Sequence, residues 1–287
     1  MKANLMTIFQ SIILGIVQGL TEFLPISSTA HLRIVPALFH WKDPGTAYSA
    51  VIQLGTMLSV IIYFWKDLAM IYGALVSEIV AFCRGEATLP LKSYESKLGF
   101  WILLGTIPIC IFGLLLKEPI EQGFLRNLNI ISFYLIFFGI LLFSSELIAK
   151  ETKTLSNINA LDVLLIGLVQ SFALIPGVSR SGVTLLAGLF VGFKRSHAAR
   201  FSFLLSVPAV LLSGVFELRI LISDFGSQGN NGLLSLTLGV FFALISGYFT
   251  IDFLLKYLQT HKTHVFVVYR VFLGLLVIYL NCRGIIR

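Results

Sequence analysis

The chain has 287 residues, of which 57% are hydrophobic and only 12% are charged. An ordinary soluble domain has about 25% charged residues. The mean hydropathy is +0.91, and several apolar runs reach the roughly 18 residues that can cross a bilayer. Because main-chain polar groups in hydrocarbon must be paired within the segment, such runs favour helices over barrel strands. The composition therefore excludes a soluble α/β enzyme and predicts an all-α polytopic membrane protein.

The charged residues and the cysteines indicate which partners, cross-links and metal sites to expect. A net charge of +7 would suggest nucleic acid for a soluble protein, but in membrane proteins Lys and Arg collect in cytoplasmic loops. We therefore expect membrane lipids, and no nucleic acid, as partners. Cys83, Cys110 and Cys282 are far apart, so they predict neither a disulfide nor a zinc site. Glu22 and Pro25 fit a signal-peptide cleavage region badly, so we expect a mature N-terminus.

Apolar stretches follow one another along the chain, and two pairs of them are short and interrupted by Pro and Ser. Such interruptions are typical of re-entrant helix-loop-helix elements. A simple proline kink is the alternative for either segment alone. The interrupted pairs are 5–23 with 30–41 and 161–175 with 182–193, and the other stretches are 47–65, 68–83, 98–116, 128–149, 201–222, 233–255 and 265–282.

The two interrupted segments resemble each other. Residues 15–29 and 167–181 both run Gly-hydrophobic-Val-Gln, then Pro, then a serine cluster, with one residue of difference in spacing. We therefore predict an internal duplication within a single membrane domain, 1–287, with repeat 1 at about 1–150 and repeat 2 at about 151–287. Corresponding broken helices in two halves indicate a binding site near the bilayer midplane.

The number of crossings decides the relative orientation of the repeats. The stretch 68–83 is short, carries Glu78 and follows Lys66 and Asp67 without a loop, so we expect it not to cross. Three helices then cross in each half, which inverts the second repeat. Basic residues are more frequent in the loops that this arrangement places inside, and both termini fall outside.

Charged side chains within both re-entrant segments indicate a functional site. A charge in the membrane interior costs at least about 2.5–3.5 kcal/mol on insertion scales. We therefore expect Glu22 and Arg180 to be partners across one cavity. Gln18 and Glu22 lie four residues apart on one helical face, and His31 follows Ser28 by three residues. The segment between Glu22 and His31 also carries the hydroxyl groups of Ser27 and Thr29.

The second segment has the features of a phosphate site. A half-helix that begins after Pro176 and Gly177 offers N–H groups beside the guanidinium of Arg180, a combination that suits phosphate. Taken singly, the serines also suit N-caps, and Glu22 with Arg180 suits a structural ion pair. The facing arrangement of the motifs favours a binding site. Its candidate residues in this segment are Ser179, Arg180, Ser181, Gly182 and Thr184.

The two motifs resemble the signature regions of bacterial undecaprenyl pyrophosphate phosphatases of the UppP/BacA type. The resemblance rests on residues 18–31, QGLTEFLPISSTAH, and 176–184, PGVSRSGVT, and extends over nearly the whole chain. It implies a hydrolase of the bacterial inner membrane with inverted re-entrant repeats. Such an enzyme removes the terminal phosphate of undecaprenyl pyrophosphate, recycles the lipid carrier of peptidoglycan synthesis and is associated with bacitracin resistance.

The resemblance also implies roles for single residues. Ser28 takes the place of the proposed nucleophile, His31 that of the family's histidine, and Arg180 that of the arginine that handles the pyrophosphate. Gln18 and Glu22 match the family's (E/Q)xxxE motif. Assistance by Mg²⁺ or Ca²⁺ is implied, with Glu22 as the metal ligand and pyrophosphate oxygens and waters completing the shell. No organic cofactor is implied.

Phosphoryl transfer is the reaction that these residues predict. The second segment holds the diphosphate while Ser28 attacks, with His31 or Glu22 as its base, and water hydrolyses the resulting phosphoserine. Direct attack by water that Glu22 activates is the alternative. We expect Ser28 to carry the chemistry because it stands three residues before His31, whereas Ser27 is placed to cap the helix.

A secondary transporter or flippase of a lipid phosphate or small anion is the second function class. Inverted repeats and broken helices suit a carrier as well as a hydrolase. Ser28 beside His31 favours the hydrolase, because a carrier needs no nucleophile. The family resemblance implies a long-chain prenyl diphosphate as substrate and a cavity that opens to the periplasmic side. The sequence leaves a monomer and a homodimer open.

Overall fold

The computed structural model describes residues 7–85, 91–116, 126–226 and 230–286, without the side chains of 215–231. Lys2, Lys117 and Arg287, which the inverted arrangement assigns to outside loops, lie outside these ranges. Over the described residues the secondary structure is helical, apart from one isolated bridge between Lys153 and Phe193. The prediction of an all-α protein is confirmed.

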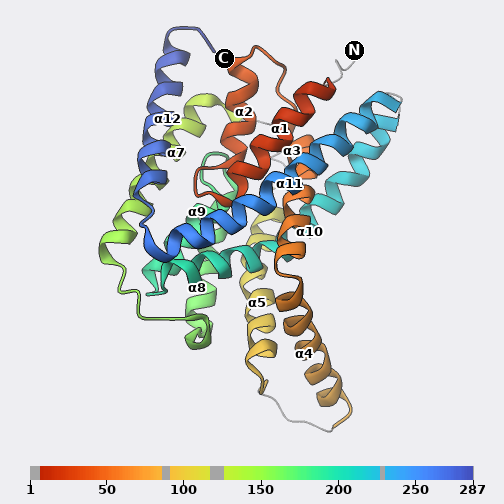
Figure 1. Ribbon diagram of the computed structural model, residues 1–287, viewed down its shortest axis with the longest axis vertical. Coiled ribbons are helices and arrows are strands. Elements are labelled where there is room, and N and C mark those ends of the chain that lie inside the picture. The colour runs from red at the N-terminus through yellow and green to blue at the C-terminus, as the bar shows by residue number, and fades with distance from the viewer. Residues whose placement is uncertain (1–6, 86–90, 117–125, 227–229, 287) are drawn as a thin grey trace.

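The helices follow the predicted apolar stretches (Figure 1). The first half contains α1 (Ile8–Phe23), α2 (Ser28–Leu38), α3 (Gly45–Tyr63), α4 (Trp65–Cys83), α5 (Tyr94–Leu115) and α7 (Leu128–Ile148). The second half contains η2 (Leu155–Asn157), α8 (Ala160–Gln170), η3 (Ser171–Leu174), α9 (Arg180–Phe190), α10 (Arg195–Gly226), α11 (Asn230–Thr260) and α12 (His264–Cys282).

Six of the described helices are long and apolar enough to cross a membrane. They are α3, α5 and α7 in the first half, and parts of α10 and α11 with all of α12 in the second. Helix α4 is not among them, in agreement with the expectation that the stretch 68–83 does not cross. The chain is therefore a polytopic membrane protein with three candidate spans in each half.

Both interrupted segments fold as helix, tip and helix. The first tip is 24–27, and the second is 175–179. Each contains a proline, which disfavours helical backbone at the preceding residue. Accordingly, Leu24 has ψ 140° and Ile175 has ψ 121°. In Figure 1, α1 and α2 occupy the upper part of the molecule and α8 rises from below, so that the two tips lie near the middle.

Each re-entrant element packs closely against a span of the other half. Helix α1 lies on α11, and α8 lies on α5. A Cβ added to Gly15 would stand 2.3 Å from the carbonyl oxygen of Gly239, and one on Gly167 would stand 2.5 Å from that of Gly105. Gly15 and Gly167 are the matching first residues of the two motifs. The same close helix crossing therefore occurs twice.

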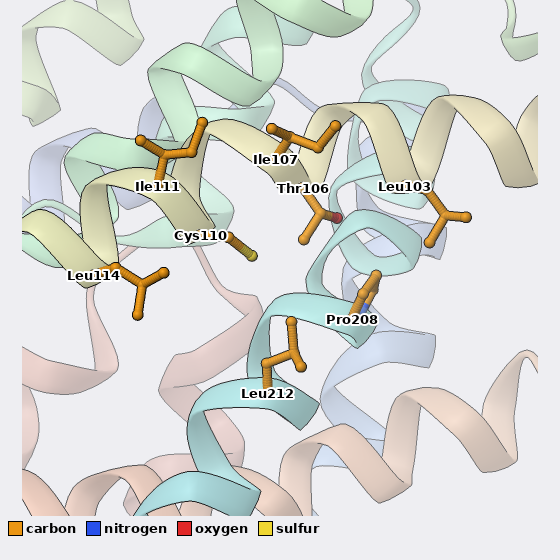
Figure 2. A pocket seen from close by; sticks show the side chains of 8 residues that line it. All are labelled: Leu103, Thr106, Ile107, Cys110, Ile111, Leu114, Pro208 and Leu212. Carbon is orange, nitrogen blue, oxygen red and sulfur yellow. The ribbon is translucent and has the colours of Figure 1, made fainter.

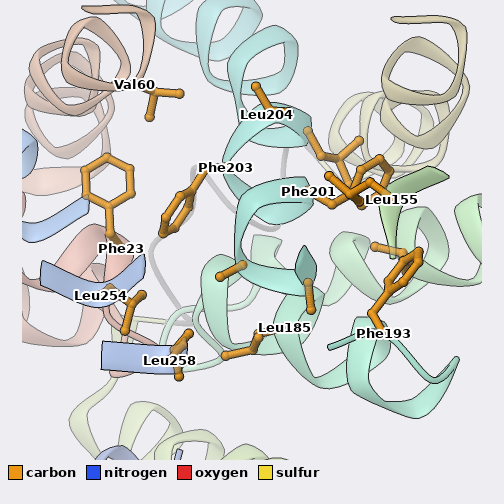
Figure 3. Close-up of a cluster of buried hydrophobic side chains, with 14 of the residues drawn as sticks. Phe23, Val60, Leu155, Leu185, Phe193, Phe201, Phe203, Leu204, Leu254 and Leu258 are labelled. Carbon is orange, nitrogen blue, oxygen red and sulfur yellow. The ribbon is translucent and has the colours of Figure 1, made fainter. Parts of the chain in front are cut away.

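An apolar core supports the inner end of α1. Phe23 packs edge-on against Phe203 with ring centroids 5.2 Å apart, and Leu185 and Leu254 belong to the same buried cluster (Figure 3). Between helices in a membrane, such contacts stabilise mainly through van der Waals packing. Because Phe23 follows Glu22 directly, this packing fixes the backbone that carries the carboxylate.

Ion pairs connect the ends of neighbouring helices at positions away from the two tips. Asp43, in the loop between α2 and α3, accepts from Arg126 before α7 at 2.5 and 3.0 Å. Burial alone would raise the pKa of Asp43, but the Arg126 guanidinium, the Gly45 N–H and Arg33 together lower the pKa below its ordinary value. Elsewhere, Arg195 binds Glu146 at 2.7 Å. These pairs tie α2 to α7 and α7 to α10.

Candidate active site

The two re-entrant tips touch each other. The backbone N–H of Gly177 donates to Thr29 Oγ1 at 3.5 Å, and Ser181 Oγ donates to the carbonyl oxygen of Leu24 at 3.1 Å. Gly177 has φ +96°, and a Cβ there would stand 2.5 Å from the Ile131 carbonyl oxygen. Only glycine fits this close approach without displacing α7.

Glu22 is the centre of the polar group between the tips. Its Oε2 accepts from Gln18 Nε2 at 2.8 Å and from Ser28 Oγ at 2.6 Å. Its Oε1 accepts from Arg180 Nη2. Glu22 is only 6% exposed. The predicted pairing of Glu22 with Arg180 and the predicted shared face of Gln18 and Glu22 are both confirmed.

Two N-cap serines set the register of the half-helices. Ser27 Oγ accepts from Ala30 N at 3.4 Å, and Ser179 Oγ accepts from Gly182 N at 3.1 Å. Both serines have a positive φ, 73° and 74°, a region that costs a residue with a side chain about 1–3 kcal/mol and is common at active sites. Ser28 and Arg180 are consequently the first residues of α2 and α9.

His31 is not placed where the sequence suggested. Its Nδ1–H donates to the Ser27 carbonyl oxygen at 2.7 Å, and its Nε2 accepts from the Tyr269 hydroxyl at 2.7 Å. Ser28 instead donates to Glu22. Of the two bases that the sequence offered for Ser28, the structure brings only Glu22 into contact. Three residues of helical spacing put Ser28 and His31 on one side, but their polar atoms bind different partners.

The remaining predicted residues form hydrogen bonds with partners other than Glu22. Thr29 Oγ1 lies 3.1 Å from Ser27 Oγ, and Ser181 Oγ lies 3.2 Å from Ser179 Oγ. The hydroxyl of Thr184 donates to the Arg180 carbonyl oxygen at 2.8 Å and contacts Ser202 of α10. It therefore joins α9 to α10. The N–H of Gly182 is occupied by the Ser179 cap.

Sequence reasoning missed polar side chains that come from elsewhere. Tyr269 and Arg270 of α12 reach the tips, and Arg270 is 1% exposed. A charge in the middle of the apolar stretch 265–282 was the available signal. Gln170, the repeat counterpart of Gln18, is fully buried, and its side-chain amide has no hydrogen-bond partner among the described residues.

The donor set around Glu22 does not by itself fit a divalent cation. Ca²⁺ takes six to eight oxygen ligands, and Mg²⁺ takes a near-ideal octahedron. Glu22 is the carboxylate of this group, and one of its oxygens already binds the Arg180 cation. The described residues contain no cluster of three or more His, Cys, Asp or Glu suited to a metal. A role for Mg²⁺ or Ca²⁺ stays a prediction.

The cavity between α5 and α10 is of a different kind. It measures about 310 Å³ and is lined by apolar side chains together with Thr106, Cys110 and Pro208 (Figure 2). The Thr106 hydroxyl donates to the Ile102 carbonyl oxygen. This lining offers no charge to a phosphate, so the polar group at the tips is the candidate active site.

Comparisons with known proteins agree with the motifs. Residues 11–276 match the family model described as bacitracin resistance protein BacA. An undecaprenyl-diphosphatase of Gloeobacter violaceus is 49% identical over 281 residues, covering 97% of this chain and 93% of the relative. Another, of Myxococcus xanthus, is 50% identical over 280 residues, covering 97% and 91%. The chain belongs to the BacA family.

Proposed function

We propose that this protein is an undecaprenyl-diphosphatase. It hydrolyses undecaprenyl pyrophosphate to undecaprenyl phosphate and inorganic phosphate, which recycles the lipid carrier for peptidoglycan and cell-wall synthesis. The observation that carries the proposal is the contact of a carboxylate, a hydroxyl and a guanidinium between the tips, in Glu22, Ser28 and Arg180. Family membership and the names of the relatives support the substrate.

Arg180 binds the diphosphate in this account. A guanidinium has five N–H donors in a planar fork that matches phosphate oxygens. One of its nitrogens holds Glu22, so the others can hold phosphate. Arg180 is also the first residue of α9, and the positive end of the helix favours an anion there. Arg180 therefore links the phosphate to the carboxylate.

Ser28 is the nucleophile, and Glu22 is its base. Ser28 Oγ forms a bond to the terminal phosphorus while the bond from that phosphorus to the bridging oxygen breaks, and prenyl phosphate leaves. The Ser28 proton passes to Glu22 Oε2, which already accepts it in a hydrogen bond of 2.6 Å. Water then attacks the phosphorus of the phosphoserine, and the bond from phosphorus to Ser28 Oγ breaks. Glu22 returns its proton to Ser28 Oγ, and inorganic phosphate leaves with the oxygen and the protons of the water.

His31 orients the loop in this mechanism. Its bond to the Ser27 carbonyl oxygen fixes the residue that caps α2 and so the direction of Ser28. Direct attack by water on the terminal phosphorus is the second route, with Glu22 again as the base. Glu22 is the base in both routes. The routes differ in the nucleophile, which is Ser28 in the first and water in the second. Neither route includes a step that is assigned to a metal ion.

We infer that the two halves form an inverted repeat in the bacterial inner membrane and that the site opens to the periplasmic side. The excess of basic residues in the loops placed inside supports this orientation. The start of α1 and the end of α12 lie at the same end of the molecule as the turn between α2 and α3 (Figure 1), as the inverted arrangement requires.

Phosphate release by the purified protein tests the function. In detergent micelles there is no gradient, so a carrier has no net transport to perform. We expect wild-type protein to release inorganic phosphate from undecaprenyl pyrophosphate and not from undecaprenyl phosphate. Monodisperse protein that releases no phosphate, yet moves the lipid between leaflets of a vesicle, would support the transporter and contradict the proposal.

A further inference from the structure

Arg270 lies in the first half of α12 and is almost completely buried. At 1% exposure it is one of the largest fully buried side chains of the described chain. Its Nε donates to Leu135 O at 3.0 Å, and Nη2 donates to Tyr134 O at 3.3 Å, both on α7. Nη1 donates to Pro25 O at 3.1 Å. Nη2 also donates to Gly177 O and Val178 O at 3.0 Å each.

These acceptors are main-chain carbonyl oxygens from three separate segments. Pro25 belongs to the first tip, and Gly177 and Val178 belong to the second. Pro25 stands three residues before Ser28, and Val178 stands two residues before Arg180. One guanidinium thus holds the backbone on both sides of the polar group. The neighbouring glycines leave it room, since a Cβ on Gly182 would stand 3.0 Å from Arg270 Nη1.

Packing alone does not account for an arginine at this position. Taking a charge out of water is expensive, and a well-packed apolar residue of similar volume is often as stabilising as a buried charge. An apolar side chain would fill the space, but it would leave the tip carbonyls without donors. What the arginine adds is a fixed spacing between two loops that are far apart in the sequence.

We propose that Arg270 is a positioning residue for the phosphatase reaction. It holds both tips in place so that Ser28 can attack the same diphosphate that Arg180 binds. This inference rests on the proposed function. Arg270 bonds to backbone and not to the Glu22 group, so it acts on the reaction through the tips. Lysine cannot replace it, because one ammonium group cannot span acceptors in three segments.

The expected kinetic effect falls on turnover. A displacement of about 1 Å of reacting groups can cost about a hundredfold in rate. We expect R270K and R270Q to lower kcat about a hundredfold while KM changes no more than about threefold, because Arg180 still binds the phosphate. Amide hydrogen exchange should rise in the peptides that contain 24–30 and 175–183 and stay unchanged in α3.

R195K is the matched control. Arg195 is a partly buried arginine with 15% of its side chain exposed, and its partners are Glu146 and Glu151, away from the tips. We expect R195K to lower the melting temperature while keeping kcat and the exchange of both tips at wild-type values. A purely structural role for Arg270 would give its variants the same pattern as R195K.

Three results would overturn the proposal. The first is wild-type kcat in folded R270K and R270Q. The second is unchanged hydrogen exchange at both tips. The third is failure of both Arg270 variants to give monodisperse protein when R195K does, which makes Arg270 a residue required for folding. If wild-type protein releases no phosphate, the proposed function fails, while the exchange measurement still decides whether Arg270 holds the tips.

Discussion

Ser27 and Ser28 are neighbours with different partners. Ser27 caps α2, and its carbonyl oxygen binds His31, whereas the Ser28 hydroxyl donates to Glu22. We expect Ser27→Ala to keep measurable phosphatase activity and Ser28→Ala to lose nearly all of it, because only Ser28 supplies a nucleophile. Steady-state phosphate release from equal amounts of monodisperse protein measures the difference.

Stability does not separate these two variants. The Ser27 cap is long, at 3.4 Å, and loss of an N-cap costs about 0.5–2 kcal/mol. Loss of a hydrogen bond to a charged group costs about 1.5–3 kcal/mol, so Ser28→Ala is also destabilised. Activity is therefore the deciding measurement. Substantial turnover in Ser28→Ala would exclude the phosphoserine and favour the attack by water.

Substitution of Arg180 tests whether this residue binds the diphosphate. We expect Arg180→Lys to lower kcat/KM by about 10²–10³-fold, a loss typical of removing one preorganised donor to a developing charge, because an ammonium cannot reproduce a bidentate contact. Turnover near wild type in the monodisperse variant would show that Arg180 does not hold the phosphate. Loss of folded protein would instead indicate a structural ion pair with Glu22.

At the scale of residues, contacts between residues close in the sequence could be predicted, and contacts between residues far apart could not. The pair of Gln18 and Glu22 follows from helical periodicity, and the Ser27 cap follows from the proline before it. The partner of His31 is Tyr269, 238 residues away, so helical spacing from Ser28 gave the wrong contact. The charge of Arg270 within an apolar stretch was visible in the sequence, but its partners were not, because main-chain carbonyl groups carry no side-chain signature.

At the scale of elements, Pro25 and Pro176 correctly predicted that each segment breaks into two helices. Each proline lacks an N–H and restricts the residue before it, which is local information. Helix ends were less predictable. Helices α10 and α11 have 32 and 31 residues and exceed the apolar stretches 201–222 and 233–255, because polar residues at their ends continue the helix.

The two glycine crossings give a test of helix packing. We expect Gly15→Ala and Gly167→Ala to lower the melting temperature, because the added Cβ would stand 2.3 or 2.5 Å from a backbone oxygen, and overpacking costs about 1–3 kcal/mol. Gly73→Ala in α4 is the control. A Cβ there meets nothing within 4 Å, so alanine should stabilise the helix by about 0.5–1 kcal/mol.

Thermal unfolding in one detergent compares the three glycine variants. A melting temperature at or above that of wild type for Gly15→Ala or Gly167→Ala would contradict the close crossings of α1 with α11 and α8 with α5. The helix propensity of alanine alone cannot produce the expected decrease, since Gly73→Ala experiences the same propensity change with the opposite expected result.

At the scale of the whole molecule, composition predicted the class and the count of candidate spans. It could not predict that α1 packs on α11 and α8 on α5, because these helices lie in different halves of the sequence. Close contact there depends on small residues, which hydropathy does not distinguish. The position of the site between the tips follows from this interlocking of the two halves.

Thiol labelling tests the inverted topology. In a cysteine-free background, single cysteines at Lys42 and Ser156 should react with an impermeant reagent from opposite sides, because three spans of the first half separate them. Positions 90 and 228 lie outside the described residues and should label from the inside and the outside, respectively. Labelling of Lys42→Cys and Ser156→Cys from the same side would contradict the inverted repeat.

The central claim is that Glu22 acts as the base of a diphosphate-hydrolysing site between two re-entrant tips. Glu22→Gln tests it most directly, because the amide keeps the size of the side chain and can still accept from Arg180 but cannot take the proton of Ser28 or water. General base catalysis contributes about 10²–10⁴-fold. We predict that purified, folded Glu22→Gln releases phosphate from undecaprenyl pyrophosphate at least a hundredfold more slowly than wild type, and release at the wild-type rate would contradict the account.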